Sequence, residues 1–481
     1  MRGKAEIGRG LGNWLPTSVP KKEEESHGCI RSERSTRLHV TADAEPRALP
    51  RSRQTPGVVD AVGSNDRSLA MNGISRRFQG LWRQPDFIRL WLGQTVSLLG
   101  SSVSGLALPL VAVLTLHASA SQMGVLYFLN RAPYLFFALL FGGWVDRVRR
   151  RRLLIWTDVA RGLLTLSIPL AAWVQLLTIA AFWLIALFIA AATLVFELAY
   201  RAYLPGLVGR ERIVEANSRL EVSSSTTSLV GPPLAGMLVQ VLTAPIAVLV
   251  DAISFFISSL SLGLIEGPEE LPPSGVARSL RNELLAGLAF LFGHPILRLL
   301  TVMTATFNFF MMSYVSLSLL YQVRELRLST LQIGILGGVG AIGALLGAAL
   351  VPALNRRLGV GRTLIAARVL MQLGLVATPA AFGPPALILS MLAAGALLFG
   401  SGINFSNITQ TSYRQTLVPD SLQARVHAAQ LQVVFGSSAL GALAAGWLGQ
   451  LAGLRPTLWL AFAGTTLPLL MLLASPVARE R

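Results

Sequence analysis

The chain has 481 residues, of which 53% are hydrophobic and only 14% are charged, so it is far more apolar than a typical soluble protein. Its formal net charge of +17 would suit a nucleic-acid binder only if the basic residues formed one soluble face, and here they punctuate apolar segments. The composition therefore indicates a protein of the lipid bilayer and excludes a nucleic-acid partner.

Sequence motifs for metal binding, redox chemistry and ATP hydrolysis are absent from the chain. Cys29 is the only cysteine and the five histidines are scattered, which argues against an intrachain disulfide and a zinc site. The sequence has no GxxxxGK[ST] loop, the backbone cradle that an ATP-driven pump needs. We expect no enzyme, no cofactor and no metal, so any work must be driven by an ion or solute gradient.

The first 70 residues differ in composition from the rest of the chain. They are polar and of mixed charge, and they hold all three lysines, Lys4, Lys21 and Lys22. Two interpretations stay open: residues 1–70 form a disordered polar tail, or the true start of the protein is Met71.

Apolar runs long enough to span a bilayer dominate the remainder. A spanning helix needs about 20 mostly apolar residues, because every backbone polar group in lipid must be paired within the segment. The sequence therefore predicts an all-α membrane protein with twelve transmembrane helices. They are expected at 88–116, 122–145, 153–176, 179–200, 217–241, 245–265, 297–320, 330–353, 363–382, 385–408, 427–450 and 457–475.

The arginines predict the orientation of these helices. Loops at 146–152, 210–219 and 355–362 carry arginine, whereas the alternate loops at 117–122 and 242–245 carry none. Since short cytoplasmic loops are rich in Lys and Arg, both termini are expected in the cytoplasm of a bacterium, with the protein in the cytoplasmic membrane. The exceptions on the outer side are Arg324, Glu325, Arg327 and Arg455.

An internal repeat is visible at a spacing of 210 residues. GPPLAG at 231–236 matches GALAAG at 441–446, and Tyr203 matches Tyr413. Six spans are thus duplicated in parallel, which predicts a substrate path between two six-helix bundles. The expected division is an N-terminal bundle at 71–265, a cytoplasmic linker at 266–295, a C-terminal bundle at 296–475 and a short cytoplasmic tail at 476–481.

The linker contains a short amphipathic pattern. Leu280, Leu284, Leu285 and Leu288 share one helical face, which predicts a helix lying on the cytoplasmic membrane surface.

The stretch GGWVDRVRRRR at 142–152 resembles the loop signature of the major facilitator superfamily. Gly142, Asp146, Arg147, Arg150 and Arg151 match that signature, while Arg149 replaces a glycine. The resemblance implies a conformational latch formed by Gly142, Asp146, Arg147 and Arg150. The alternative is that these arginines are only a topology signal.

Two further resemblances bear on function. GPPLAG, with Gly231, Pro232, Pro233 and Gly236, resembles the glycine-proline motif of antiporters in the same superfamily; a helix bend or plain close packing explains it equally well. The segments at 204–218, 249–256 and 294–300 resemble the branch that includes macrolide-efflux proteins and the enterobactin exporter. This resemblance runs from about Phe87 to Ala474 and implies drug or siderophore efflux.

Polar residues at helical spacing inside the apolar spans are candidates for a central cavity. Three spans supply them, although serine and threonine also bond the carbonyls of their own helix. The candidates are Gln94, Ser97, Ser101 and Ser104 in the first span, Thr301, Thr304 and Asn308 in the seventh, and Asn404, Asn407 and Thr411 in the tenth.

Charged residues inside spans are candidates by default, because a buried charge needs a partner or a watery cavity. Arg131 lies in the second span and Asp251 in the sixth. Asp251 could carry a proton or act as a structural hydrogen-bond acceptor. Asp158 with Arg161, and Glu197 with Arg201, have the spacing of intrahelical pairs or latch partners.

Together these features predict a monomeric secondary-active exporter that exchanges an amphipathic small molecule for protons by alternating access. Two rivals stay open: an importer or uniporter of a small metabolite, and a membrane scaffold or sensor that transports nothing.

Overall fold

The computed structural model describes residues 80–137, 144–145, 148–267, 269, 280–419 and 422–475. The predicted tail at 1–70 and the tail at 476–481 lie outside these residues. All regular elements in the described part are helices, and ten of these helices are long and apolar enough to cross a membrane. The chain is therefore an all-helical membrane protein.

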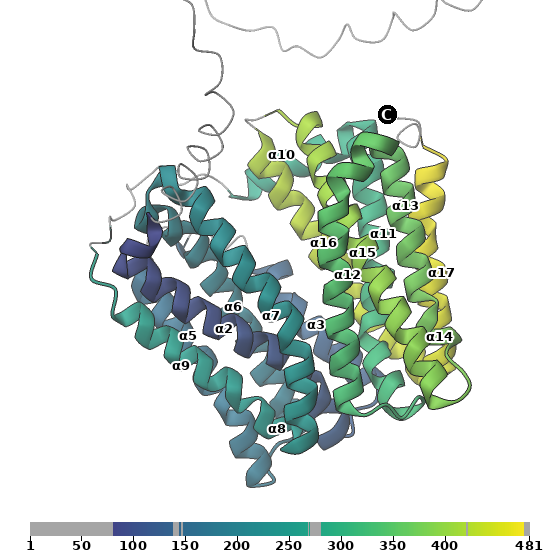
Figure 1. The fold of residues 1–481 in the computed structure, drawn as a ribbon, viewed down its shortest axis with the longest axis horizontal. Helices are drawn as coiled ribbons and strands as arrows, with labels where there is room; N and C mark the ends of the chain where they lie inside the picture. Colours follow the sequence, from purple (N-terminus) through teal and green to yellow (C-terminus); the bar gives the residue numbers. More distant parts are fainter. Residues whose placement is uncertain are drawn as a thin grey trace, which may run out of the picture. The chain divides into compact units, whose positions relative to one another are not determined.

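The helices that precede the linker, here called the N-terminal set, lie side by side in Figure 1. They begin with α2 (Pro85–Leu110), which runs through a π-helical turn at Val111–Thr115 into the loop before α3. The others are α3 (Ala120–Phe136), α5 (Arg150–Trp173), α6 (Ile179–Val208), α7 (Ile213–Val241), the short α8 (Ala244–Ala247) and α9 (Leu249–Gly263).

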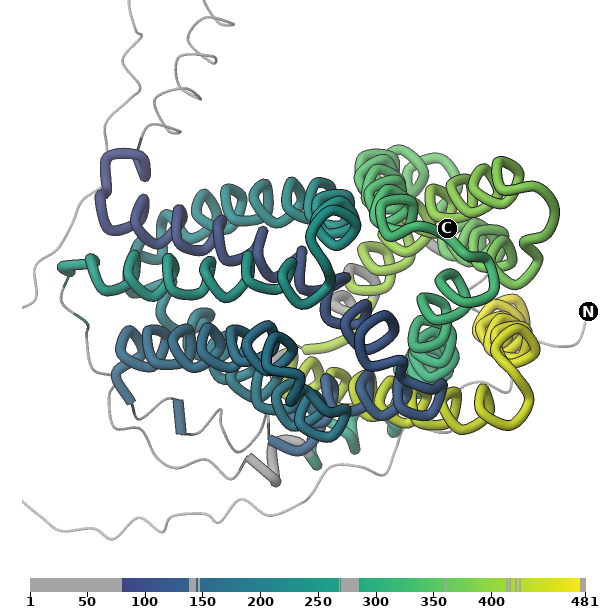
Figure 2. The backbone as a smooth tube through the Cα atoms, turned by 90° about the horizontal axis from the view of Figure 1, so that it is seen from below, coloured from purple at the N-terminus to yellow at the C-terminus, as the bar shows by residue number. Residues whose placement is uncertain are grey.

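The helices that follow the linker form the C-terminal set, coloured green to yellow in Figures 1 and 2. Between the two sets along the chain comes α10 (Leu280–Gly293). The set contains α11 (Pro295–Arg324), α12 (Thr330–Leu358), α13 (Val360–Leu375), the short α14 (Ala377–Ala380), α15 (Pro385–Leu417), α16 (Gln423–Ala452) and α17 (Leu454–Leu473).

Two of the twelve predicted spans are not among the ten apolar helices of the described residues. The second predicted span coincides with α3, which the structure describes over 17 residues. The fifth coincides with α7, whose 29 residues include a run of serines and threonines at 223–228. Both segments are helical: α7 is less apolar because of its serines and threonines, whereas α3 is described over fewer residues than its predicted span.

Tryptophans on α5 mark the width of the apolar zone. Trp156 is 69% exposed and Trp173 is 82% exposed. At 1.5 Å per helical residue they are about 25 Å apart along the axis, which agrees with aromatic residues at two membrane interfaces.

The two sets repeat the same neighbour relations. In the N-terminal set α2 packs against α7 and α9, and α5 packs against α6; in the C-terminal set α11 packs against α16 and α17, and α13 against α15. Capping boxes start α3 at Ser119 and α12 at Ser329, exactly one repeat apart. His117 and Arg327, also 210 residues apart, both take a positive φ, 49° and 52°.

Two close glycine contacts join the sets near the arginine-poor ends of the helices. On one side α7 meets α12: an added Cβ on Gly236 would lie 3.1 Å from Cα of Gly334. On the other side α3 meets α16, where an added Cβ on Gly446 would lie 2.8 Å from Cα of Gly124. Gly334 and Gly446 stand 210 residues after Gly124 and Gly236, so the same glycine contact is made twice.

Arg324 strengthens this end, which explains its departure from the charge pattern of the loops. Its guanidinium donates to the carbonyls of His117 and Ala118 at 3.1 and 2.8 Å, across the two sets. The Thr330 hydroxyl likewise donates to the Gly236 carbonyl at 3.0 Å. Backbone carbonyls at the ends of helices are thereby satisfied by the opposite set.

Among the described residues, the buried apolar cluster that joins the two sets lies at this end. The largest cluster joins Leu110 and Ile168 of the N-terminal set to Leu320 and Leu458 of the C-terminal set. A second cluster around Leu154 and Tyr203 holds residues of the N-terminal set alone. The remaining clusters belong to the C-terminal helices and α10.

The predicted amphipathic linker helix exists as α10, but it packs on protein. Leu291 is buried together with Leu297, Val426 and Ala429, and Leu288 packs against the same cluster. The start of α16 covers one of its faces, while Leu285 stays 50% exposed, and a position on the cytoplasmic membrane surface stays a prediction.

Candidate functional site

Of the four predicted latch residues, only Arg150 lies in the described part; Gly142, Asp146 and Arg147 lie outside it. The Arg150 guanidinium donates to the Ala202 carbonyl of α6 at 3.2 Å, and its backbone N–H donates to Glu269. A carboxylate at the first turn of α5 is favoured by the helix dipole. Arg150 is thus held within the N-terminal set and by the start of the linker.

Arg151 binds the C-terminal end of helix α9. Its guanidinium donates to the carbonyls of Leu262 and Gly263 at 3.0 and 2.6 Å, which are among the last carbonyls of α9. Cations are stabilising at helix C-termini because those carbonyls lack intrahelical partners. The arginine-rich loop therefore ties α5 to α6, α9 and the linker in this state.

The polar face of the first span packs against α9. Gln94, Ser97 and Ser104 are buried, and Ser101 donates to the Asp251 carboxylate of α9 at 3.2 Å. The central-path expectation for these residues stays a prediction. Helical spacing shows which residues share one face of a helix, but it does not show which helix packs against that face. Here the polar face of α2 packs against the serines of α9.

Asp251 itself is 3% exposed and accepts a hydrogen bond from Ser254 at 3.3 Å in addition to that from Ser101. It also lies within electrostatic range of Arg161. Arg131, the other predicted charge, lies on α3 with its guanidinium 5.8 Å from the Phe435 ring of α16. The two charged residues therefore face different neighbours.

Asp158 and Arg161 form a buried ion pair within α5, as their spacing predicts. The guanidinium is stacked between Phe196 of α6, at 4.0 Å, and Phe255 of α9, at 4.3 Å. Glu197 and Arg201, the other predicted pair, are not joined by an ion pair. Arg161 thus brings two carboxylates, Asp158 and Asp251, under the influence of one cation.

The glycine-proline motif lies inside the continuous helix α7 and packs on two neighbours. Gly231 allows the close approach of Ser102 on α2, whereas an added Cβ on Gly337 or Gly338 of α12 would lie 2.8 Å from Pro232 or Pro233. Small residues permit this helix contact. The packing interpretation thereby gains a physical basis, and a role of the motif in export stays a prediction.

A polar cavity of about 650 Å³ lies among α11, α15 and α16. Thr304 and Asn308, predicted from the seventh span, line it together with Asn407 and Thr411 from the tenth. The structure thus brings these two predicted faces together. Asn404 points elsewhere, since its amide donates to the Ala344 carbonyl of α12 at 2.7 Å.

Sequence reasoning missed the cationic side of this cavity. Arg414 and His427 line it, as do Gln410, Gln423 and Gln430. Burial lowers the pKa of Arg414 to about 10, which leaves its guanidinium charged at neutral pH. Arg414 stands near the end of its helix, where an arginine is easily interpreted as a marker of membrane orientation. Its helical spacing from Gln410 and Asn407, four and seven residues earlier, could have identified it as part of the same polar face.

A second cavity of about 530 Å³ lies between the two sets. Ser102 and Pro109 of α2, Tyr127 of α3, Tyr314 of α11 and Phe399 of α15 are among its lining residues. Its walls are mainly apolar and aromatic, with a few hydroxyl and amide groups. It lies beside the glycine contacts that join α7 to α12, since Pro232 and Gly337 also line it.

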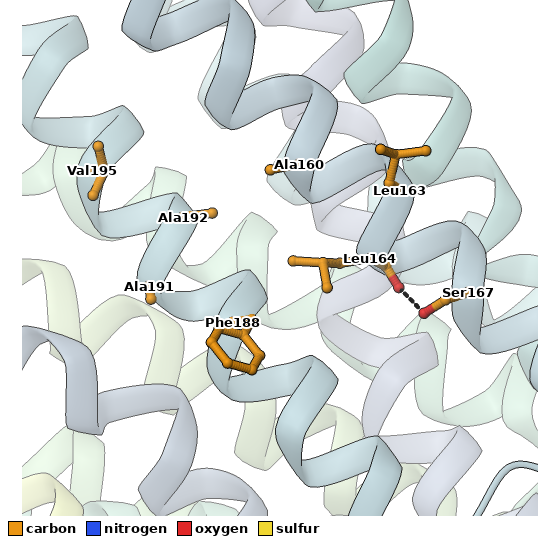
Figure 3. A pocket seen from close by; sticks show the side chains of 8 residues that line it. All are labelled: Ala160, Leu163, Leu164, Ser167, Phe188, Ala191, Ala192 and Val195. Carbon is orange, nitrogen blue, oxygen red and sulfur yellow. Dashed lines mark hydrogen bonds between the residues drawn. The ribbon is translucent and has the colours of Figure 1, made fainter.

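A third hollow lies between α5 and α6 and is shown in Figure 3. Alanine, leucine, valine and phenylalanine line it, and its single hydroxyl, on Ser167, donates to the Leu164 carbonyl of its own helix at 2.6 Å. Leu163 and Phe188 are each more than half exposed. Such an apolar outer surface suits contact with lipid chains and offers no polar group to a cargo.

A family model described as Major Facilitator Superfamily matches residues 90–442. The chain belongs to this superfamily. It is thereby a transporter of small-molecule cargo in a membrane, and the family is non-enzymatic.

Two groups of relatives carry functional names. The chain is 26% identical to the multidrug efflux pump Tap of Mycolicibacterium fortuitum over 383 residues, which cover 78% of this chain and 90% of the relative. It is 26% identical to the enterobactin exporter EntS of Shigella flexneri over 368 residues, covering 76% of this chain and 85% of the relative. Both are distant bacterial efflux proteins.

Solved structures share the fold at low identity. The nucleoside transporter NupG superposes with a TM-score of 0.66 at 15% identity, covering 81% of this chain and 98% of that one. A bacterial homologue of the iron transporter ferroportin, 18% identical, gives a TM-score of 0.66 in its inward-facing state, again covering 81% and 98%. Its outward-facing state gives 0.54.

Proposed function

We propose that this protein is a secondary-active exporter of amphipathic small molecules, built from twelve spanning helices in two repeated bundles with both termini in the cytoplasm. The bundles rock about a central path, and protons entering the cell drive cargo outward. The protein works as a monomer in a bacterial cytoplasmic membrane.

The observation that carries the proposal is the glycine contact made twice at the arginine-poor end. The Gly236–Gly334 and Gly124–Gly446 contacts close that end symmetrically. Away from it, the buried apolar clusters belong to separate sets, and the polar cavity around Asn308 and Arg414 lies there. A closed outer end is one of the two states that alternating access requires, although α3 and α16 stay in contact as far inward as Leu135 and Gln432.

α3 and α7 have a specific part in this architecture. α3 contacts α16 and α7 contacts α12, so both helices lie where the two sets meet. Helices at a rocking interface must pack against each other through small residues, so they spend less of their surface on lipid. Together with the ten long apolar helices, these two helices support a count of twelve.

Export rather than import is supported by the names of the relatives, which are an efflux pump and an exporter. Proton coupling is supported by the buried charges of the N-terminal set. Asp158, Asp251 and Arg161 sum to one negative charge when both carboxyls are ionised. Because an uncompensated charge is costly inside a membrane, protonation of Asp251 would neutralise the cluster.

Inside-out vesicles with an acid interior and a pH-sensitive dye test this mechanism. Macrolides, siderophores and lipophilic cations are added in turn, and we expect one class to release protons from wild-type vesicles. Asp251→Asn should abolish this release. Glu211→Gln, at an exposed residue of a cytoplasmic loop, is the matched control and should behave as wild type.

Two results would replace the proposal. If labelled compound crosses without any proton movement, the protein is a uniporter. If no compound crosses in either direction while the protein is folded, the scaffold or sensor alternative takes its place.

A further inference from the structure

The cavity among α11, α15 and α16 has an uneven charge. Its described lining includes Arg414 and His427 but no carboxylate. His427 lies within electrostatic range of both Arg414 and Arg201, the latter on α6 of the N-terminal set. Arg201 is not among the lining residues, so Arg414 is the charged group of the described lining.

Arg414 lacks a counter-charge of its own. No described carboxylate pairs with its guanidinium, unlike Arg161, Arg89 and Arg219, which each bind an acid. Removing a cation from water is costly unless an anion and hydrogen bonds replace the solvent. A partly buried and unpaired guanidinium beside a cavity is thus suited to bind an anion that enters it.

The rest of the lining divides into polar and apolar parts. Gln410 is engaged, because its amide donates to Ser406 at 2.9 Å, and the Asn308 amide donates to the Thr304 carbonyl at 2.8 Å. The side-chain oxygen of Gln430 has no hydrogen-bond partner. The apolar part consists of Val418, Val426, Leu431 and Val434.

We propose that this cavity is the cargo site and that it selects amphipathic organic acids, with Arg414 binding the carboxylate or phenolate head and the valine-leucine wall covering the apolar body. Planar guanidinium groups bind such oxygens in pairs. The volume of about 650 Å³ falls within the range of small-molecule sites. This inference rests on the proposed transport function and names its substrate class.

The positive charge of Arg414 disfavours cationic cargo. A lipophilic cation in this cavity would meet Arg414 with no described acid to offset it. Repulsion of the wrong ligand contributes to specificity as much as attraction of the right one. We therefore expect discrimination by charge between molecules of equal size and shape.

Fluorescein and rhodamine 123 provide that comparison, since they share a xanthene ring system but are an anion and a cation at neutral pH. Binding is measured by fluorescence polarisation with purified full-length protein in neutral detergent, and transport by dye uptake into inside-out vesicles. The variants are Arg414→Gln, the charge-retaining Arg414→Lys, and Arg356→Gln, an exposed arginine at the end of α12 that serves as control.

Wild type and Arg356→Gln should bind and transport fluorescein in preference to rhodamine 123. Loss of a charge-assisted hydrogen bond should weaken fluorescein binding about tenfold to hundredfold in Arg414→Gln, with partial rescue in Arg414→Lys. Because an anionic lipid headgroup offers similar chemistry, a short-chain phosphatidylglycerol is added as competitor. Displacement of fluorescein at equal concentration would assign the site to lipid and overturn the proposal.

The remaining outcomes separate this inference from the transport function. Equal or faster transport of rhodamine 123, or unchanged fluorescein binding in Arg414→Gln, overturns the substrate class and leaves the exporter standing. Selective fluorescein binding without uptake of either dye supports the anion site and argues against transport. Failure of wild type to bind either dye overturns the anion site.

Discussion

The N-terminal and C-terminal sets share their helix packing but differ in their buried charges. In the N-terminal set, Asp158 is fully buried and paired with Arg161. Arg368 of α13 occupies the position 210 residues later, where it is 3% exposed and stacks 4.5 Å from the Phe307 ring. Its Nε and Nη1 atoms have no hydrogen-bond partner. Equivalent positions of the two sets therefore hold a paired acid and an unpaired cation.

This difference shows that repetition of the backbone does not extend to the electrostatics. Helix packing depends on small residues such as Gly236 and Gly446, which both sets keep. The polar interior can diverge, because any buried charge is tolerated where it finds a partner or a use. In our proposal the acidic set handles protons and the cationic set handles an anionic cargo.

The largest expected effect comes from breaking the paired charge. Arg161→Leu leaves Asp158 buried without its partner, and we expect the free energy of unfolding to fall by about 3–5 kcal/mol. Denaturant unfolding in mixed micelles, followed by helical circular dichroism, measures this. The double variant Asp158→Leu/Arg161→Leu should recover most of the loss; a double variant as unstable as the single one would show that ring stacking on Phe196, not the ion pair, stabilises α5.

The unpaired charge should respond in the opposite direction. Arg368→Leu removes a buried guanidinium that lacks an acid and fills the space with apolar volume, so we expect stability to rise by about 1–4 kcal/mol. Arg368→Lys, which keeps the charge, should not rise. The same unfolding measurement checks both. A loss of stability in Arg368→Leu would mean that its packing on Phe307 outweighs the cost of the charge.

Sequence reasoning succeeded for the helices because lipid leaves few choices. Every predicted span overlaps a described helix, and ten of these helices are long and apolar enough to cross a membrane, since backbone groups in hydrocarbon must pair within the segment. α7 illustrates the limit. Its serine-rich half is helical because it packs on α2 and α12, and hydropathy does not record that neighbour.

Only some of the residues that line the cavity could be predicted, because the sequence does not show which helices pack against each other. Thr304, Asn308, Asn407 and Thr411 were found because polar groups in lipid need an explanation, and they meet at one cavity. Ser101 has the same pattern but turns to Asp251. Periodicity defines a face and not its neighbour, and it cannot separate Arg414, which lines the cavity, from arginines that mark topology.

The shared glycine contact gives the sharpest test of equivalence between the sets. Gly236→Leu and Gly446→Leu should each overpack the closed end by about 1–3 kcal/mol, which shifts the closed population by about 5- to 150-fold. Ser318→Cys in a Cys29→Ser background lines the cavity between the sets, so labelling by an impermeant maleimide from outside should rise equally in both. Gly206→Leu, where an added Cβ meets nothing within 4 Å, should leave labelling unchanged.

If only one of the two substitutions, Gly236→Leu or Gly446→Leu, increased labelling, the two contacts would open independently, because a symmetric rocking motion must break both contacts together.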